Sequence, residues 1–282
     1  MSFVVFGATG HLGRLTVEHL LARGVAPADI VATGRATAKL SDLADRGVRV
    51  VAVDRDDAGA VASVLNEGDR VLLISGIEPN RVEQHRTVID AAVAAGVGQL
   101  VYTSGPHADT SSLMLLADHA ATETLLAQAP IPTIVLRNGW YVENYTDQIE
   151  TYRAHGMVGA AGDGKVSVAL RSELAEAAAV VLTTDGHEGR TYELGGGAVT
   201  VPEIATLISA ATGEEIGYTN VDVETLQGIL AGAGVPAPMD AVFADVDRGI
   251  SEGELLVPTT DLEALLGRPV LAPEAAFRQA LA

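Results

Sequence analysis

The sequence predicts an α/β fold in which a doubly wound parallel sheet is joined to a smaller, interleaved C-terminal α/β domain. Apolar, β-branched runs recur along the first half of the chain, and the segments between them are long enough for crossover helices. The runs are continuously apolar, which is typical of strands covered by helices on both faces. The first run leads directly into a glycine-rich turn. After Gly139 the pattern loosens into helices and one further strand candidate.

The apolar periodicity assigns each element a range. Strands are expected at residues 3–6, 30–33, 48–53, 71–74, 100–103 and 133–136, with a later one at 191–194. Helices are expected at residues 12–22, 58–65, 81–95, 112–127, 173–182, 202–211 and 224–230. We therefore expect a dinucleotide-binding domain over residues 1–150 and a smaller substrate domain over residues 151–282. The segment near residues 191–197 is expected to return to the sheet.

Composition excludes several classes of function. The 282-residue chain is 48% hydrophobic, which suits a globular protein with a large core. It has no cysteine, which excludes disulfides, thiolate metal sites and a cysteine nucleophile. The net charge is −19, and residues 151–282 hold 19 of the 37 acidic side chains. Such a surface repels phosphate backbones, so nucleic-acid binding is disfavoured and a solvated acidic surface is the preferred interpretation.

The N-terminus has no basic segment before its apolar run, and no apolar run approaches the ~20 residues that cross a bilayer. We therefore expect a cytoplasmic protein that has no cleaved signal and does not bind a membrane. The sequence does not decide whether the protein forms a homodimer, because an apolar dimer patch and an apolar core look alike in a sequence.

The glycine turn has the pattern of a dinucleotide site. Gly7, Gly10 and Gly13 follow a strand and open a helix, the context that this motif requires. The first glycine allows a sharp turn, the second allows backbone to approach a pyrophosphate, and the third allows helix and strand to pack closely. The phosphates would lie at the helix N-terminus, where free N–H groups favour negative charge.

The ends of the next strands suggest which dinucleotide is bound. An NAD site commonly has an acidic residue after the second strand, whereas this chain has Arg35, a planar fork suited to the 2′-phosphate of NADPH. Lys39 is a weaker candidate for the same phosphate. Asp54, after the third strand, either accepts from an adenine amino group or caps its loop. Ser75 and Gly76 follow the fourth strand, at the sheet edge where ligands of such folds bind.

A loop rich in amide and aromatic residues follows the sixth strand. Asn138 can donate and accept hydrogen bonds, as the carboxamide of nicotinamide requires. Trp140 and Tyr141 either form a flat apolar wall for an aromatic substrate or pack against the second domain.

Several longer motifs are similar to those of one family. They are Gln84-His85-Arg86, Tyr102-Thr103-Ser104, His107–Ser111, Leu136–Tyr145, Ala160–Lys165 and Gly186–Arg190. With the glycine turn they resemble the NmrA-like atypical short-chain dehydrogenases/reductases, and most of all the type-2 NAD(P)H:quinone oxidoreductases. The resemblance covers nearly the whole chain. It implies a Rossmann-type NADPH-binding domain, a small C-terminal substrate domain, and hydride transfer to a quinone without a flavin.

The resemblance also implies a set of residues around the cofactor. They are Gly7, Thr9, Gly10, His11, Leu12, Arg35, Ser75, Thr103, Ser104, Asn138, Trp140 and Tyr141, and the cofactor segment continues from Gly139 to Glu143.

The usual catalytic pair of short-chain dehydrogenases is missing. Leu115 stands at the place of the tyrosine and His119 at the place of the lysine. Alcohol dehydrogenation needs a base and is therefore disfavoured, whereas quinone reduction needs mainly positioning and a proton. His119, His107 and Tyr141 are the candidates for delivering or orienting that proton, and a purely structural role is the alternative for each histidine.

Neither a metal site nor a hydrolase is expected. The histidines lack ligand spacing, the Gly162-Asp163-Gly164 turn offers too few oxygens for calcium, and Ser104 lies outside a Gly-x-Ser-x-Gly elbow. The leading hypothesis is an NADPH-dependent reductase of quinones or similar planar acceptors, with triphenylmethane dyes as a variant. The other hypothesis is a non-catalytic redox sensor of the NmrA type, which would bind the dinucleotide and a protein partner without turnover.

Overall fold

The computed structural model describes all 282 residues, which form two compact units interleaved along the sequence. Unit 1 comprises Met1–Gly105, Asp118–Arg137 and Arg171–Tyr192, and unit 2 comprises Pro106–Ala117, Asn138–Leu170 and Glu193–Ala282. The boundary expected at residue 150 falls within a segment of unit 2, because the chain passes between the units several times.

The large sheet has seven strands. They are β1 (Phe3–Phe6), β2 (Ile30–Gly34), β3 (Arg49–Ala52), β4 (Arg70–Ile74), β5 (Gln99–Ser104), β6 (Thr133–Asn138) and β10 (Thr191–Leu194). Their order is β10-β6-β5-β4-β1-β2-β3, and β1 to β6 pair in parallel. The order reverses beside β1, which lies between β2 and β4. This arrangement confirms the predicted doubly wound sheet, whose ligand site lies at such a reversal.

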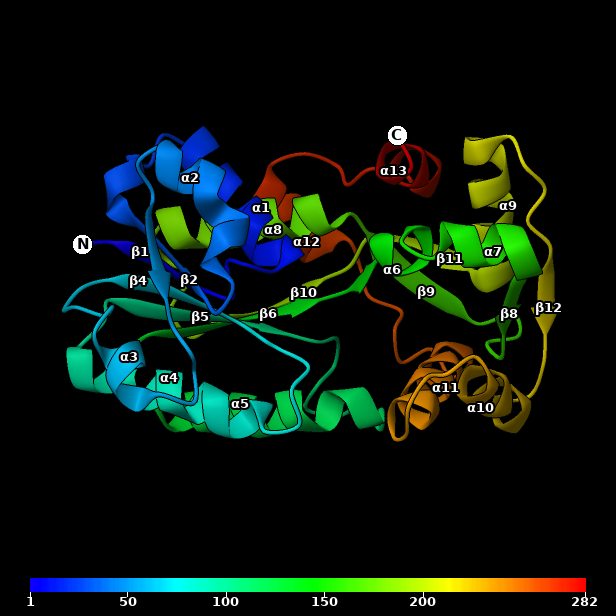
Figure 1. The fold of residues 1–282 in the computed structure, drawn as a ribbon, viewed down its shortest axis with the longest axis horizontal. Helices are drawn as coiled ribbons and strands as arrows, with labels where there is room; N and C mark the ends of the chain where they lie inside the picture. Colours follow the sequence, from blue (N-terminus) through cyan, green and yellow to red (C-terminus); the bar gives the residue numbers. More distant parts are fainter. The chain divides into compact units, whose positions relative to one another are not determined.

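Helices cover both faces of this sheet. They are α1 (His11–Ala22), α2 (Ser41–Asp45), α3 (Ala58–Ala62), α4 (Arg81–Ala95), α5 (Ala117–Gln128) and α8 (Arg171–Thr183). Figure 1 shows α1 and α8 on one side of the strands and α3, α4 and α5 on the other. Double coverage explains why the strands are continuously apolar, and Val4, Phe6, Leu73 and Leu100 are fully buried.

Two predicted helices are shorter than expected. The helix predicted over residues 112–127 begins at Ala117, after an extended Leu113 and a 3₁₀ turn over Met114–Leu116. Leu113 and Leu116 join the core of unit 2, and this packing overrides the helical pattern. The helix predicted over residues 58–65 ends at Ala62, where the Ser63 hydroxyl donates to the Ala60 carbonyl at 2.7 Å.

Unit 2 contains two small sheets that the sequence pattern did not predict. One has β7 (Trp140–Tyr141), β9 (Lys165–Ala169) and β11 (Gly197–Thr200) in the order β11-β9-β7. The other pairs β8 (Met157–Gly159) with β12 (Tyr218–Asn220). These strands are short and lie among helices, so no recurring run of apolar residues reveals them.

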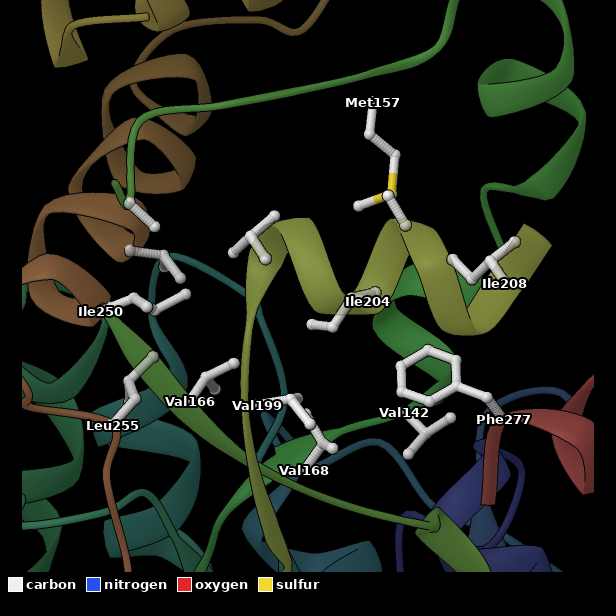
Figure 2. Packing of buried hydrophobic residues seen from close by; sticks show 14 of the residues in the cluster. Val142, Met157, Val166, Val168, Val199, Ile204, Ile208, Ile250, Leu255 and Phe277 are labelled. Carbon is white, nitrogen blue, oxygen red and sulfur yellow. The ribbon is translucent and has the colours of Figure 1, made fainter. Parts of the chain in front are cut away.

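The helices of unit 2 enclose a separate core. They are α6 (Glu143–Thr146), α7 (Ile149–His155), α9 (Val201–Thr212), α10 (Val223–Gly232), α11 (Met239–Ser251), α12 (Thr260–Leu266) and α13 (Pro273–Ala280). Figure 2 shows Ile204 and Ile208 of α9 in the same buried cluster as Val142, Val199 and Phe277. None of the helices of either unit is both long and apolar enough to cross a bilayer.

Candidate functional site

The glycine turn after β1 leaves a helix N-terminus open for an anion. Gly7 has a φ of +93°, and Gly10 N–H donates to the Gly7 carbonyl at 3.0 Å. No side chain caps the start of α1, and its first turn carries no acidic residue. The first N–H groups of the helix therefore have no partner within it or from a cap, which is the arrangement that binds a pyrophosphate.

Close backbone packing fixes two further glycines. A Cβ on Gly13 would meet the Gly7 carbonyl oxygen and would lie 2.7 Å from the Ala8 Cα. A Cβ on Gly34 would lie 2.5 Å from the Thr9 hydroxyl oxygen. Thr9 therefore packs directly over the end of β2, and this brings the glycine turn beside the segment that carries Arg35.

Arg35 is the exposed cation at the end of β2. Its side chain is 63% exposed, and its guanidinium pairs with Glu78 at 2.5 Å. Glu78 also lies 3.6 Å from the Arg55 guanidinium, which donates to the Ile74 carbonyl at 2.9 Å. Burial acts to raise the pKa of Glu78, but backbone hydrogen bonds and the two arginines outweigh it and lower that pKa overall. The geometry thus places one carboxylate where two arginines meet.

Three further predicted residues line the same edge of unit 1. Asp54 is exposed, and its carboxylate accepts from Asp56 N–H at 3.1 Å, so it caps its own turn. Ser75 N–H donates to the Thr103 hydroxyl at 3.1 Å, which ties the ends of β4 and β5 together. Gly76 lies against Glu78 and Arg55, because a Cβ there would be 2.7 Å from Arg55 Nη2.

Two predicted residues at the start of α1 differ in exposure. Leu12 is buried in the core of unit 1, whereas His11 is exposed at the helix N-terminus. Lys39, the weaker candidate for the phosphate, is also exposed. Its carbonyl accepts from Arg14 at 3.0 Å.

Ser104 belongs to a buried ionic network. Its hydroxyl donates to Glu123 at 2.6 Å, and Glu123 pairs with Arg137 at 2.6 Å. Both partners of this ion pair are nearly buried, so the network holds β5, α5 and β6 in register. This pairing favours a structural role for the Ser104 side chain.

The loop after β6 presents an unpartnered amide oxygen. Asn138 donates from Nδ2 to the Tyr141 hydroxyl at 3.3 Å, while its buried Oδ1 has no hydrogen-bond partner. Gly139 N–H donates to the Leu194 carbonyl at 2.9 Å, and a Cβ there would lie 2.8 Å from that oxygen. A buried acceptor without a donor suits the amino group of a carboxamide.

The aromatic residues of this loop lie in unit 2. Trp140 pairs with Val168 across β7 and β9 and packs, half-buried, against the unit 2 core. Tyr141 and Glu143 are half-buried as well, and Glu143 begins α6. Trp140 therefore combines core packing with an accessible edge, and both interpretations of this ring from the sequence remain compatible with its position.

His119 is placed inside unit 1. Its side chain is 9% exposed, and its Nδ1 lies 2.9 Å from the Tyr102 hydroxyl. Burial, with added repulsion from Arg81, lowers the pKa of His119 to about 3. A neutral imidazole bonded to a buried tyrosine favours the structural alternative over proton delivery at neutral pH.

His107 has an unusual backbone in unit 2. Its φ is +50°, and it is the one non-glycine residue of the chain with a positive φ. Its side chain is 36% exposed, with Nδ1 3.5 Å from Glu193 and Nε2 3.3 Å from the Leu256 carbonyl. Such backbone strain is found at functional sites, and His107 stays a candidate for the proton.

Sequence reasoning missed Arg55 and Glu78 beside Arg35. Arg55 follows directly after the predicted Asp54, but an arginine in a loop gives no local signal of burial. Glu78 lies in the loop between β4 and α4, and only the fold brings it to the end of β2. The residues of unit 1 described above nevertheless fit the phosphates of an NADPH molecule, with a glycine cradle and an arginine that already holds an anion. In unit 2, the unpartnered amide oxygen of Asn138 fits a carboxamide.

The comparisons with known proteins agree with one another. The sequence model of the NmrA-like family matches residues 2–253 of this chain. Quinone oxidoreductase 2 of Escherichia coli strain K12 is 41% identical over 268 residues, which are 94% of this chain and 93% of that protein.

Two solved structures are similar over nearly the whole chain. The structure of an NADPH-dependent quinone oxidoreductase of Escherichia coli, complexed with NADPH, is 39% identical with a TM-score of 0.91 and covers 99% of this chain and 98% of that one. The triphenylmethane reductase of Citrobacter sp., complexed with NADP(H), is 34% identical with a TM-score of 0.90 and covers 99% of this chain and 100% of that one.

Proposed function

The chain belongs to the NmrA-like family, and from this premise we propose that it is an NADPH-dependent reductase that transfers hydride to a quinone or similar planar acceptor without flavin or metal. The likeness that carries the proposal is 41% identity to a quinone oxidoreductase over 94% of this chain. The geometry of the glycine turn, Arg35 and Asn138 supports it, because these residues suit the three chemically distinct parts of NADPH.

The residues of unit 1 would bind the phosphates. The N–H groups at the start of α1 would hold the pyrophosphate, and Arg35 would hold the 2′-phosphate in a bidentate pair. The Arg35–Glu78 ion pair supports this role, since the Arg35 guanidinium already pairs with a carboxylate. The phosphate would have to displace the Glu78 carboxylate.

The residues of unit 2 would orient the reacting rings. The unpartnered Oδ1 of Asn138 would accept from the carboxamide, and Trp140 and Tyr141 would present flat surfaces to a planar acceptor. NADPH, when bound, supplies the hydride, so positioning provides most of the catalysis. His107 and Tyr141 remain candidates for protonating the acceptor oxygen, and we expect the protein in the cytoplasm.

Turnover with a benzoquinone tests this function. Purified protein mixed with NADPH and the quinone should oxidise NADPH faster than the uncatalysed mixture, and NADH should be used less well. A redox sensor would instead bind NADPH and NADP⁺ in a calorimeter without oxidising NADPH. Binding without turnover on several quinones and planar dyes would therefore overturn the reductase function and leave the sensor.

A further inference from the structure

A second arginine of unit 1 shares the carboxylate that pairs with Arg35. Arg55 follows β3, and its guanidinium Nη2 lies 3.6 Å from Glu78 Oε2. Arg35 Nη2 pairs with the other oxygen, Glu78 Oε1, at 2.5 Å. The Glu78 carboxylate therefore bridges two guanidinium groups, one on each of its oxygens. We call Arg35, Arg55 and Glu78 the two-arginine cluster.

The two arginines differ in how firmly they are held. The side chain of Arg55 is 15% exposed, and its Nη1 donates to the Ile74 carbonyl at the end of β4 at 2.9 Å. Its Nη2 forms no hydrogen bond, so this donor is available to an anion. The side chain of Arg35 is 63% exposed. Arg55 is therefore fixed before a ligand binds, which lowers the entropic cost of binding, whereas Arg35 has room to close on the ligand.

The carboxylate between the arginines is replaceable by another anion. The Glu78 carbonyl accepts from Arg81 N–H at 3.0 Å, which fixes the main chain at the start of α4. Only the Glu78 side chain has to move to admit a ligand. Gly76 leaves the space that the cluster needs, because a Cβ there would lie 2.7 Å from Arg55 Nη2 and would overlap the Glu78 carboxylate.

Two other carboxylates near Arg55 are engaged elsewhere. Asp56 accepts from two side-chain amides at or next to the start of α4, at 2.8 and 3.1 Å. Asp54 accepts from Asp56 N–H at 3.1 Å. Neither forms an ion pair with Arg35 or Arg55. A single carboxylate, that of Glu78, is thus paired with two guanidinium groups.

We propose that Arg35 and Arg55 form a clamp for the doubly charged 2′-phosphate of NADPH, so that Arg55 is a second residue that selects NADPH over NADH. A phosphate monoester carries a charge of about −1.5 to −2 at pH 7, so it balances two guanidinium groups better than one carboxylate does. The planar fork of each arginine suits phosphate oxygens. This inference rests on NADPH as the cofactor of the proposed function, and it adds a specificity residue to that site.

The clamp also gives Glu78 a role in the protein without cofactor. Burial lowers the pKa of Arg55, the Glu78 charge opposes this effect, and the Arg35 charge adds to it. Glu78 therefore holds together two cations that repel each other, and it keeps them in the bridged arrangement that a phosphate needs. NADH has a hydroxyl in place of the 2′-phosphate, so it brings no anion to replace this carboxylate.

Fragments of the cofactor test the clamp by calorimetry. The probes are adenosine 2′,5′-bisphosphate and adenosine 5′-monophosphate, which differ only in the 2′-phosphate. Arg55→Gln removes the charge and keeps a side-chain amide as a donor for the Ile74 carbonyl. Arg70→Gln is the matched control, because Arg70 begins β4, at the opposite end of the strand from Ile74, and its side chain is 19% exposed.

We expect Arg55→Gln to weaken the binding of the bisphosphate at least about tenfold and to change that of the monophosphate less than about twofold. Arg70→Gln should change neither by more than about twofold. Arg55→Lys restores the charge and should bring bisphosphate binding to within about threefold of the unmodified protein. Equal bisphosphate binding by Arg55→Gln and the unmodified protein would overturn the proposal. Equal losses for both fragments, or an Arg55→Lys protein as weak as Arg55→Gln, would do the same.

The unmodified protein gives a second test that does not depend on how a variant folds. At about pH 8 the phosphate of adenosine 2′-monophosphate carries two negative charges, whereas its methyl diester carries one. The monoester should bind at least about tenfold more tightly, because two charges are needed to balance both arginines. Equal affinities of the two esters would contradict the clamp. The proposed function fails separately, through the absence of quinone turnover with NADPH, because these fragments carry no hydride.

Discussion

The glycine-turn end of unit 1 and the loop after β6 in unit 2 offer different kinds of contact. In unit 1, Arg35 pairs with Glu78, and Arg137 pairs with Glu123. In unit 2, the buried Oδ1 of Asn138 has no hydrogen-bond partner. The first region holds arginines and an open helix N-terminus for an anionic cofactor. The second holds a neutral amide and flat rings. The two proposals therefore assign ionic contacts to the recognition of the cofactor phosphates and neutral contacts to the recognition of the reacting rings.

The largest expected effect concerns the glycine turn. Gly13→Ala puts a Cβ against the Gly7 carbonyl and the Ala8 Cα, which are backbone atoms that cannot rotate away. We expect a loss of about 2–4 kcal/mol in the free energy of unfolding and at least about a hundredfold weaker NADPH binding. Urea denaturation and calorimetric titration measure the two quantities.

Gly228→Ala is the matched control, because an added Cβ on this glycine of α10 meets no atom within 4 Å. It should leave NADPH binding unchanged and stabilise the fold by up to about 1 kcal/mol. If Gly13→Ala behaved like this control, the close packing of the turn would not matter for the cofactor.

The buried histidines of unit 1 should make stability depend on pH. Burial lowers the pKa of His85 and of His119 to about 3, whereas an unfolded histidine has a pKa of about 6.5. Below pH 6.5 the unfolded chain takes up protons that the folded chain does not. Stability is therefore complete above pH 6.5 and falls toward pH 3, by up to about 1.4 kcal/mol per pH unit for each histidine.

His119→Asn removes one of these two contributions and keeps an acceptor for the Tyr102 hydroxyl. The slope of unfolding free energy between pH 4 and pH 6 should become shallower by about 1 kcal/mol per pH unit, and His155→Asn at an exposed position of α7 should leave it unchanged. An unchanged slope in His119→Asn would contradict the neutral, buried state of this histidine.

Arg35→Ala tests the choice of cofactor. Removal of the guanidinium should weaken NADPH binding about tenfold to a hundredfold and leave NADH almost unaffected, since only NADPH carries the 2′-phosphate. Arg46→Ala, which removes another exposed arginine of unit 1, is the control. Equal weakening of both cofactors by Arg35→Ala would remove this residue from the phosphate site.

The smallest expected effect concerns Glu78, the carboxylate that already pairs with Arg35. Glu78→Gln removes the charge with which the 2′-phosphate competes, so NADPH should bind a few times more tightly while NADH binding is unchanged. Glu83→Gln on the exposed side of α4 provides the control. Weaker NADPH binding by Glu78→Gln would mean that Glu78 orients Arg35 for the phosphate instead of competing with it.

The sequence predicted unit 1 far better than unit 2, for a physical reason. The strands and glycines of unit 1 follow one another in short repeats, so the pattern around Gly7 and the end of β2 reveals both fold and cofactor. The two small sheets of unit 2 are assembled from short strands between Trp140 and Asn220, and no spacing connects them. The position of Glu78 beside Arg35 was not predicted for the same reason: only the parallel sheet brings its loop to Arg35.

Packing and burial, which depend on the fold, explain the remaining differences between the sequence prediction and the structure. The helix predicted from residue 112 begins five residues later because Leu113 and Leu116 pack in the core of unit 2. His119 looked suited to proton transfer by residue type, yet its burial beside Tyr102 holds it neutral. Residue type alone does not tell whether a titratable group is buried.

A two-ligand binding comparison of Arg35→Ala and Asn138→Leu tests the division of labour between the two regions most directly. The affinities for NADPH and for adenosine 2′,5′-bisphosphate, which lacks the nicotinamide, are measured by calorimetry for both variants and the unmodified protein. Arg35→Ala should weaken both ligands at least about tenfold, and Asn138→Leu should weaken only NADPH, about threefold to tenfold. If Asn138→Leu weakened both ligands equally, the assignment of the cofactor phosphate to unit 1 and the carboxamide to unit 2 would be contradicted.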